Sequence, residues 1–276
     1  MEIILIVVGI VLIGVYLYYE NTRLQTTKHI ITNSKIPKGF DGYKIAHISD
    51  FHNTKSEKLT NSLINEIQKS SPNVIVITGD TIDSRRTRID IAFNFIKQLV
   101  KITDVYYVPG NHESRIVEYE AFKESLLSIG VNLLENDTVI LTENGENINL
   151  LGIKDPAFYY DQQVDDKEIV KEELEIIKYN KEPYTILLSH RPEVFDTYVM
   201  QDIDLVFTGH AHGGQIRIPL IGGVIAPVQG FFPKFSEGIH NKNNTTMIIS
   251  RGIGNSLFPF RVNNRPELLI VELKNK

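Results

Sequence analysis

Residues 74–80 read VIVITGD and residues 105–113 read VYYVPGNHE, and the two stretches share one pattern. Each is a short run of mainly β-branched or aromatic residues that leads into a glycine followed by Asp or Asn. Such runs are typical of strands buried on both faces, as in parallel sheets covered by helices. Similar runs end in polar residues at residues 45–52 (IAHISDFH), 186–190 (ILLSH) and 205–214 (LVFTGHAHGG). Segments with helical apolar spacing lie at residues 57–69, 90–101 and 166–179. The sequence therefore predicts an α/β fold.

A second set of strands is expected in the middle and at the end of the chain, separated by Asn/Gly turns such as ENGE at residues 143–146. These strands are residues 139–141, 148–153, 215–218, 247–249 and 268–273. We predict two sheets that share one core and are flanked by helices. The expected organisation is an anchor at residues 1–20, a tether at residues 21–41 and one domain at residues 42–276.

The amino terminus carries an uncharged run at residues 3–19, IILIVVGIVLIGVYLYY. As a helix this run is about 25 Å long at 1.5 Å per residue, the short end of a membrane span. A buried helix and a cleaved signal peptide are the alternatives, but Glu2 stands where a signal peptide usually carries basic residues. We predict a single-pass transmembrane helix in the cell membrane. The basic residues that follow the run favour a cytoplasmic body; they are Arg23, Lys28, Lys35 and Lys38.

Composition narrows the chemistry. The chain has 276 residues and a formal net charge of −5, so a broad basic surface for nucleic acid is not expected. It contains no cysteine, which excludes disulfides, thiolate catalysis and cysteine-bound metal clusters. Metal chemistry is left to His, Asp, Glu and Asn.

Polar groups follow each of the five buried runs, and five of the eight histidines lie among them. Any one of these clusters is an ordinary turn or a lone histidine. Because strand ends meet at one edge of an open α/β sheet, five clusters together predict a metal site. The candidate ligands are Asp50, His52, Asp80, Asn111, His190, His210 and His212.

Seven ligands exceed the needs of one ion, so we expect two divalent ions with Asp80 between them. Oxygen and imidazole donors without thiolate suit manganese, iron, zinc or magnesium. Paired ions clamp the attacking and leaving oxygens of an in-line displacement, and their positive charge favours an anionic phosphoester as the substrate.

The order of these motifs resembles the calcineurin-like metallophosphoesterases. The motifs are Asp50-x-His52, Gly79-Asp80-x-x-Asp83, Gly110-Asn111-His112-Glu113, His190 and Gly209-His210-x-His212. The resemblance covers residues 42–276 and implies a two-sheet sandwich that hydrolyses phosphoesters with a metal-bound hydroxide. It implies one ion on Asp50, His52 and His212, a second on Asn111, His190 and His210, and Asp80 on both. It also implies that His112 protonates the leaving oxygen and that Asp83 orients His112.

Within that family, residues 209–215 (GHAHGGQ), 189–193 (SHRPE) and 250–254 (SRGIG) resemble a bacterial membrane-associated branch. That branch includes hydrolases of the pyrophosphate in UDP-2,3-diacylglucosamine, which implies a lipid- or nucleotide-linked (pyro)phosphate as substrate. The first motif departs from the family by continuing as FHNT at residues 51–54, without the Leu-His-x-Gly of many members. This departure leaves the ligands intact.

Arg191 and Arg251 are candidate phosphate contacts, because the guanidinium fork matches phosphate oxygens. Either could instead be an ion-pair partner. Residues 218–235 (IPLIGGVIAPVQGFFPKF) are unusually apolar for a Gly/Pro-rich loop, so they form a packed loop, a substrate-covering flap or a lipid contact. Two other functions stay open: a non-catalytic metal-binding sensor or scaffold for phosphate ligands, and a dimetal amide hydrolase.

Overall fold

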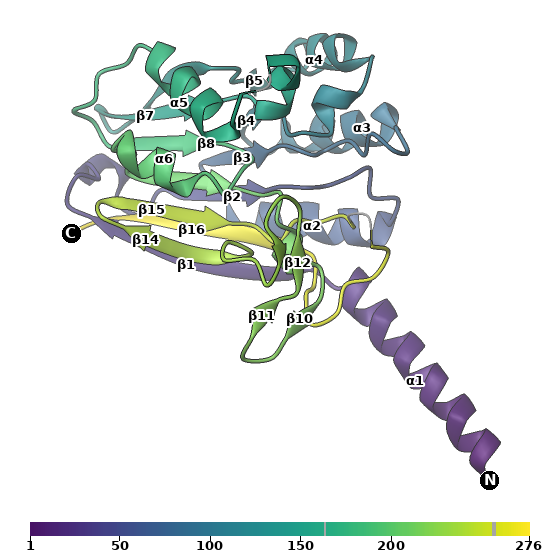
Figure 1. Cartoon of the computed structure of the whole chain (residues 1–276). Coiled ribbons are helices and arrows are strands. Elements are labelled where there is room, and N and C mark those ends of the chain that lie inside the picture. Colours follow the sequence, from purple (N-terminus) through teal and green to yellow (C-terminus); the bar gives the residue numbers. More distant parts are fainter. Residues whose placement is uncertain (163, 256–257) are drawn as a thin grey trace.

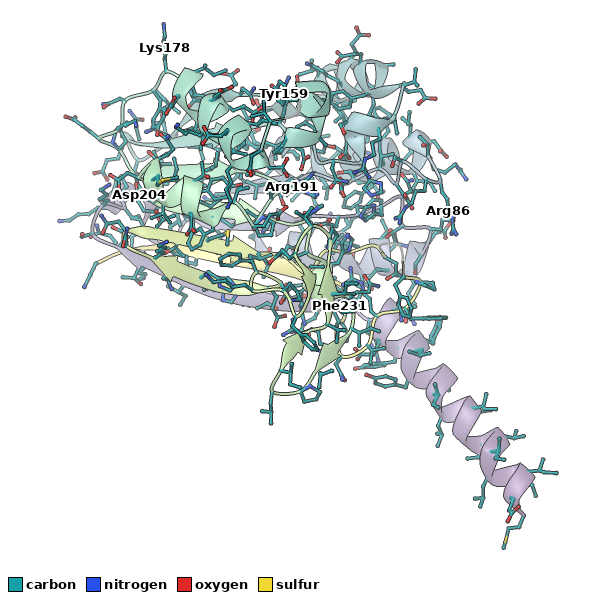
Figure 2. All side chains as sticks on the ribbon, in the orientation of Figure 1. Arg86, Tyr159, Lys178, Arg191, Asp204 and Phe231 are labelled. Carbon is teal, nitrogen blue, oxygen red and sulfur yellow. The ribbon has the colours of Figure 1, made fainter. Side chains whose placement is uncertain are left out.

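The computed structural model describes residues 1–162, 164–255 and 258–276. The domain is a sandwich of two sheets with helices on both outer faces, and a long helix, α1, projects from one end of it (Figure 1). Side chains fill the spaces between these layers (Figure 2).

The first sheet has the strand order β1-β16-β2-β3-β4-β5 over the described residues. Its strands are β1 (Gln25–Asn33), β2 (Lys44–Ile48), β3 (Val74–Thr78), β4 (Asp104–Val108), β5 (Asn132–Leu133) and β16 (Glu267–Asn275). Strands β2 to β5 run parallel, whereas β16 is antiparallel to β2. Parallel neighbours bring the carboxyl ends of β2, β3 and β4 to the same edge.

The second sheet has the order β14-β15-β9-β8-β7-β6 over the same described residues. Its strands are β6 (Asp137–Glu143), β7 (Glu146–Gly152), β8 (Thr185–Leu188), β9 (Leu205–Thr208), β14 (Gly238–Lys242) and β15 (Thr245–Ile249). Strands β7, β8, β9 and β15 are parallel, and the two outer strands are antiparallel to their neighbours.

Helices cover the outer faces of both sheets. The first sheet packs against α2 (Glu57–Ser70), α3 (Ile89–Leu99) and α4 (Tyr119–Ser128), and the second against α5 (Asp166–Ile176) and α6 (Phe195–Met200). Short 3-10 turns occur at Lys38–Phe40, Glu113–Arg115, Pro156–Gln162 and His212–Gly214. Helix α2 begins where the sequence supplies a cap, because the Ser56 side chain accepts a hydrogen bond from the Leu59 amide.

The core forms three apolar layers, and strand alternation sets which residue enters which layer. On β2, Ile45 joins the layer between the two sheets, whereas Ala46 and Ile48 face the helices of the first sheet. A third layer packs α5 and α6 on the second sheet. The predicted two-sheet α/β sandwich is confirmed.

Two features differ from the expectations. The five buried runs do not share one sheet: β2, β3 and β4 belong to the first, and β8 and β9 to the second. The segment assigned to a tether, residues 21–41, contributes the nine-residue strand β1, which pairs with β16 from Gln25 opposite Glu267 to Asn33 opposite Asn275. A polar edge strand carries a weak sequence signal because only one partner and one buried face define it.

Helix α1 (Glu2–Thr22) is long and apolar enough to cross a membrane. Its last turns are hydrogen-bonded to the body of the domain. The backbone amide of Asn264 donates to Glu20 Oε2 at 2.8 Å, and the amide of Arg261 donates to Asn21 Oδ1 at 3.0 Å. These bonds set the direction in which α1 leaves the domain.

Candidate metal centre

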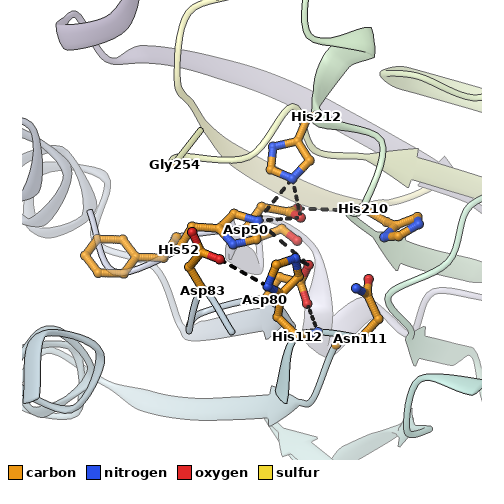
Figure 3. A network of polar contacts seen from close by, with 12 residues as sticks. Asp50, His52, Asp80, Asp83, Asn111, His112, His210, His212 and Gly254 are labelled. Atoms are coloured by element: carbon orange, nitrogen blue, oxygen red, sulfur yellow. Dashed lines mark hydrogen bonds and ion pairs between the residues drawn. The ribbon is translucent and has the colours of Figure 1, made fainter. Parts of the chain in front are cut away.

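The carboxyl ends of five strands converge on one buried cluster of carboxylates and imidazoles (Figure 3). The loop after β2 supplies Asp50 and His52, and the loop after β3 supplies Asp80. The loops after β4, β8 and β9 supply Asn111, His190, His210 and His212. All seven predicted ligands are buried, and the site lies where the edges of the two sheets meet.

The backbone is unusual at these ligands. Five non-glycine residues of the cluster have positive φ, namely Asp50 (53°), His52 (48°), Asp80 (52°), His210 (65°) and His212 (48°). Such left-handed positions cost roughly 1–3 kcal/mol each and persist only where the surrounding structure enforces them. Backbone bonds between neighbouring loops supply that constraint here, including Asp50 N–H to Gly79 O and His52 N–H to Asp80 O, both at 3.0 Å.

One group within the cluster consists of Asp50, His52 and His212. The Nε2 atom of His212 lies 3.2 Å from Asp50 Oδ1 and 3.1 Å from His52 Nε2. Glycine is required beside this group, since a Cβ at Gly209 would collide with Ser49 Oγ and Asp50 Oδ2.

A second group consists of Asp80, His190 and His210. The Nε2 atom of His190 lies 3.3 Å from Asp80 Oδ2 and 3.1 Å from His210 Nδ1. On its other side, His190 Nδ1 lies 2.7 Å from the carbonyl oxygen of Thr78. An Nδ1–H donated to that carbonyl leaves Nε2 as a lone pair directed into the site, which is the usual arrangement of a metal-binding histidine.

The cluster fits divalent cations. Within each group the candidate ligand atoms lie within 4.8 Å of one another, and Asp80 also forms a third such group with His52 and His112. Two buried atoms, Asn111 Oδ1 and His210 Nε2, have no hydrogen-bond partner among the described residues. Buried donors and acceptors are normally paired, so unpaired atoms in such a cluster fit cation ligands. These donors are compatible with several divalent metals and do not single out manganese.

Strong electrostatic coupling accompanies this packing. Burial alone would raise the pKa of Asp80, but the imidazoles of His190 and His112 outweigh it and hold that pKa well below its usual value. Burial alone would lower the pKa of His190, but the Asp80 carboxylate raises it to about 10. Burial lowers the pKa of His52 to about 3. A bound cation would favour the neutral form of each imidazole.

His112 and Asp83 stand beside the cluster, as the sequence predicts, but with an additional neighbour. His112 Nδ1 lies 3.5 Å from Asp83 Oδ1, whereas the Ser84 amide donates to the same nitrogen at 2.9 Å and the Ser84 hydroxyl lies 3.0 Å from it. A donated Ser84 N–H leaves the proton of a neutral His112 on Nε2, which lies 3.9 Å from Asp80 Oδ2. Ser84 was missed because backbone donors carry no sequence signal.

Each of the two candidate phosphate-binding arginines forms an ion pair with a carboxylate of the domain. Arg191 is 1% exposed and donates from Nε and Nη2 to the two oxygens of Asp155, at 2.5 and 2.8 Å. Arg251 Nη2 donates to Glu267 Oε1 at 2.9 Å. Both therefore match the ion-pair alternative.

Glu113 organises the loops that carry the ligands. Its Oε1 accepts the amides of Thr81 (2.7 Å) and Ile82 (3.1 Å), and its Oε2 accepts those of Asp80 and Gly110 (both 2.9 Å). One fully buried carboxylate thus ties the loop after β3 to the loop after β4. The GNHE motif contains Glu113, but the sequence alone assigned it no role.

A groove of about 510 Å³ leads away from the cluster. Its lining includes His52 and Asp83 of the site and Asn21 near the end of α1. Three basic residues, Lys55, Arg85 and Arg86, contribute to the walls. The groove thus combines one candidate ligand, His52, with cationic side chains and with a residue from the last turn of the long apolar helix.

Comparison with known proteins agrees with this site. The family model described as calcineurin-like phosphoesterase matches residues 43–214. The metallophosphoesterase YkuE of Bacillus subtilis is 28% identical over 94% of this chain and 88% of its own. The phosphodiesterase YaeI of Escherichia coli is 25% identical over 84% of this chain and 82% of its own. A transmembrane protein with a metallophosphoesterase domain from Danio rerio is 28% identical over 87% of this chain and 55% of its own. The chain belongs to the calcineurin-like phosphoesterase family and is a metal-dependent phosphoester hydrolase.

Proposed function

We propose that this chain is a membrane-anchored hydrolase with two divalent ions, and that it acts on a lipid- or nucleotide-linked phosphoester or pyrophosphate. The observation that carries the proposal is that two buried carboxylate–imidazole groups lie side by side at the ends of the strands. Asp80 Oδ2 lies 3.7 Å from His52 Nε2 of one group and 3.3 Å from His190 Nε2 of the other.

In this proposal Asp50, His52 and His212 hold one ion, Asn111, His190 and His210 hold the other, and Asp80 contacts both. When bound, two such ions supply an activated water and polarise the phosphoryl oxygens of the substrate. The contacts of the second group support the assignment, because His190 presents Nε2 to the cluster while Thr78 holds its other nitrogen.

His112 is the proposed general acid for the leaving oxygen. The acid form is the imidazolium, which carries a proton on each ring nitrogen: Nδ1 then faces Asp83 Oδ1 at 3.5 Å, and Nε2, the atom nearer Asp80, carries the proton to be donated. Burial alone would lower the pKa of His112, but the Asp80 carboxylate and Asp83 raise it. Asp83 positions the ring together with Ser84 and is itself held by Arg85 at 2.8 Å. We leave Arg191 and Arg251 outside the substrate site, since each already binds a carboxylate.

The membrane is the proposed location of the chain, with α1 as a single retained span. The hydrogen bonds that join Glu20 and Asn21 to residues 261–264 support retention, because a removed signal segment would leave those partners unpaired. The basic residues after the span, among them Arg23 and Lys28, favour a cytoplasmic domain.

A lipid-linked substrate is supported by the groove between the cluster and α1. A phosphoryl group beside His52 would place the rest of the molecule in a groove whose walls include Lys55, Arg85 and Arg86 and whose lining also includes Asn21 of α1. Cationic side chains suit a second phosphate or another anionic group of the substrate.

The proposal is tested with the full chain in nanodiscs, loaded separately with Mn²⁺, Zn²⁺ and Mg²⁺. We expect about two ions per chain by elemental analysis and hydrolysis of an aryl phosphodiester. Asp80→Asn should abolish turnover, whereas Asp137→Asn, an exposed carboxylate on β6, should leave it unchanged. Two bound ions without turnover of any phosphoester would instead favour a non-catalytic sensor.

A further inference from the structure

Two hairpins that follow the loop carrying His210 and His212 expose an unusual amount of apolar surface. They are β10 (Arg217–Ile218) with β11 (Gly222–Gly223), and β12 (Ile225–Ala226) with β13 (Gly230–Phe231). Their exposed apolar side chains, here called the hairpin surface, are Leu220, Ile221, Val228, Phe231 and Phe232. Phe231 is 73% exposed and Phe232 61% exposed. Contiguous apolar surface of this kind marks a contact with a protein, a ligand or a membrane.

The backbone shows that these side chains are poorly explained by folding alone. Leu220, Val228 and Phe232 all have positive φ, at 70°, 62° and 53°. Glycine or asparagine adopts this conformation at lower cost, and a polar residue there would improve solubility. Bulky apolar side chains at three strained and exposed positions therefore indicate a partner outside the domain.

The hairpin surface lies beside the base of α1. Tyr16 of α1 donates from its hydroxyl to Asn263 Oδ1 at 2.8 Å, and Asn263 Nδ2 donates to the carbonyl oxygen of Arg217 on β10 at 3.1 Å. The β10–β11 hairpin and α1 project from the same end of the domain (Figure 1), and Phe231 is carried by the neighbouring hairpin (Figure 2).

These contacts set a depth relative to a membrane that α1 spans. Tyr16 and the neighbouring Tyr18 and Tyr19 are the aromatic residues expected at the membrane–water boundary. Arg217 is tied to the level of Tyr16 through Asn263. From Arg217, the three residues to Leu220 extend by up to about 10 Å. That reach matches the depth to which interfacial segments enter the boundary between headgroups and acyl chains.

We propose that the hairpin surface inserts into the headgroup–acyl boundary of the same membrane that α1 spans, as a second contact that holds the groove against the bilayer. This inference rests on the proposed membrane anchoring. A bilayer is favoured over a protein partner because the β10–β11 hairpin is linked through Asn263 to Tyr16 of the apolar helix α1 and projects from the same end of the domain. The substrate class that follows is a phosphoester whose apolar part stays in the membrane.

Fluorescence gives a direct test, because the chain contains no tryptophan. Phe231→Trp introduces a single reporter into the full chain in vesicles of phosphatidylcholine and phosphatidylglycerol, with brominated acyl chains as quenchers. The matched control is Ile140→Trp, an exposed apolar position on β6 at the far edge of the second sheet. We expect at least twofold quenching for Phe231→Trp and none for Ile140→Trp. The proposal would be overturned if brominated lipid quenched the two variants to the same extent. It would also be overturned if the Phe231→Trp variant formed oligomers in which the reporter is not quenched.

A second test compares hydrolysis rates on a soluble and a membrane-embedded substrate. The double variant Leu220→Asp, Phe231→Asp should hydrolyse a soluble aryl phosphodiester at the wild-type rate, because neither residue lines the groove. With a vesicle-embedded phosphoester lipid as substrate, its rate should fall at least fivefold. Equal losses on both substrates would overturn the proposal. A wild-type chain inert toward both substrates would refute the proposed function, while the quenching measurement would still decide whether the hairpin surface enters the membrane.

Discussion

Replacing Glu113 by glutamine should destabilise the chain and impair the metal centre, although Glu113 touches no proposed ligand side chain with its own carboxylate. Two amides point at each carboxylate oxygen: those of Thr81 and Ile82 at Oε1, and those of Asp80 and Gly110 at Oε2. A glutamine keeps one oxygen and places an NH₂ group where the second oxygen stood. Two backbone donors then face another donor.

The size of the effect follows from these bonds. A hydrogen bond to a charged group contributes about 1.5–3 kcal/mol, so two lost bonds cost about 3–6 kcal/mol. Burial and the charge of Asp80 raise the pKa of Glu113, so removing its charge relieves some repulsion and offsets part of that cost. We expect a net loss of at least about 2 kcal/mol in the free energy of unfolding, against a total of about 5–15 kcal/mol for a typical protein.

Urea denaturation of the full chain in detergent, followed by circular dichroism, measures this loss. Glu124→Gln, an exposed carboxylate on α4, is the control and should change stability by less than about 0.5 kcal/mol. Below its unfolding midpoint, Glu113→Gln should also bind Mn²⁺ more weakly, because the loops that carry Asp80 and Asn111 lose their shared support. A Glu113→Gln variant as stable as the control would refute the reasoning.

Three further predictions follow from the buried charges. Burial raises the pKa of Glu173 from 4.5 to about 7, so its protonated form supports the fold below pH 4.5 and this support is lost as the pH rises through about 7. At pH 8, Glu173→Gln should therefore increase the free energy of unfolding by roughly 2–3 kcal/mol and raise Tm, whereas at pH 4 it should change neither. Thermal melts at both pH values check this, and equal Tm shifts at the two values would contradict it. Asp155→Ala leaves Arg191 buried without its main carboxylate and should lower the free energy of unfolding by about 3–5 kcal/mol, as measured by urea denaturation. A loss below about 1 kcal/mol would contradict this prediction. Adding Mn²⁺ should raise the Tm of the wild-type chain, since the ions bind the folded state, and Asp80→Asn should lose most of that rise in a thermal-shift assay; an undiminished rise would place the ions elsewhere.

The local signals in this sequence were strong because they rest on chemistry that needs no long-range contact. Buried runs such as VIVIT predict strands by composition alone, and the Asp, Asn and His residues that follow them form a set of candidate metal ligands by type. The apolar run at residues 3–19 likewise predicts one long helix, which α1 confirms.

Other features depend on partners that are distant in the chain. The runs of β3 and β9 look alike locally, yet β3 pairs with β2 and β4, whereas β9 pairs with β8 and β15. Both runs are buried on two faces, so periodicity cannot assign either one to a sheet. Only the packing of the two sheets decided this, and with it the meeting of their strand ends at one site.

The sequence by itself therefore determined the fold class, the identities of the candidate ligands and the long apolar helix α1, because short-range pattern and side-chain type suffice for each. The tertiary structure decided that residues 25–33 form a strand, that Arg191 binds Asp155, and that Glu113 joins two ligand loops. It also placed the exposed β10–β11 hairpin beside α1. Each of these depends on a hydrogen bond or pairing between groups far apart in sequence, and such bonds exist only once the chain has packed.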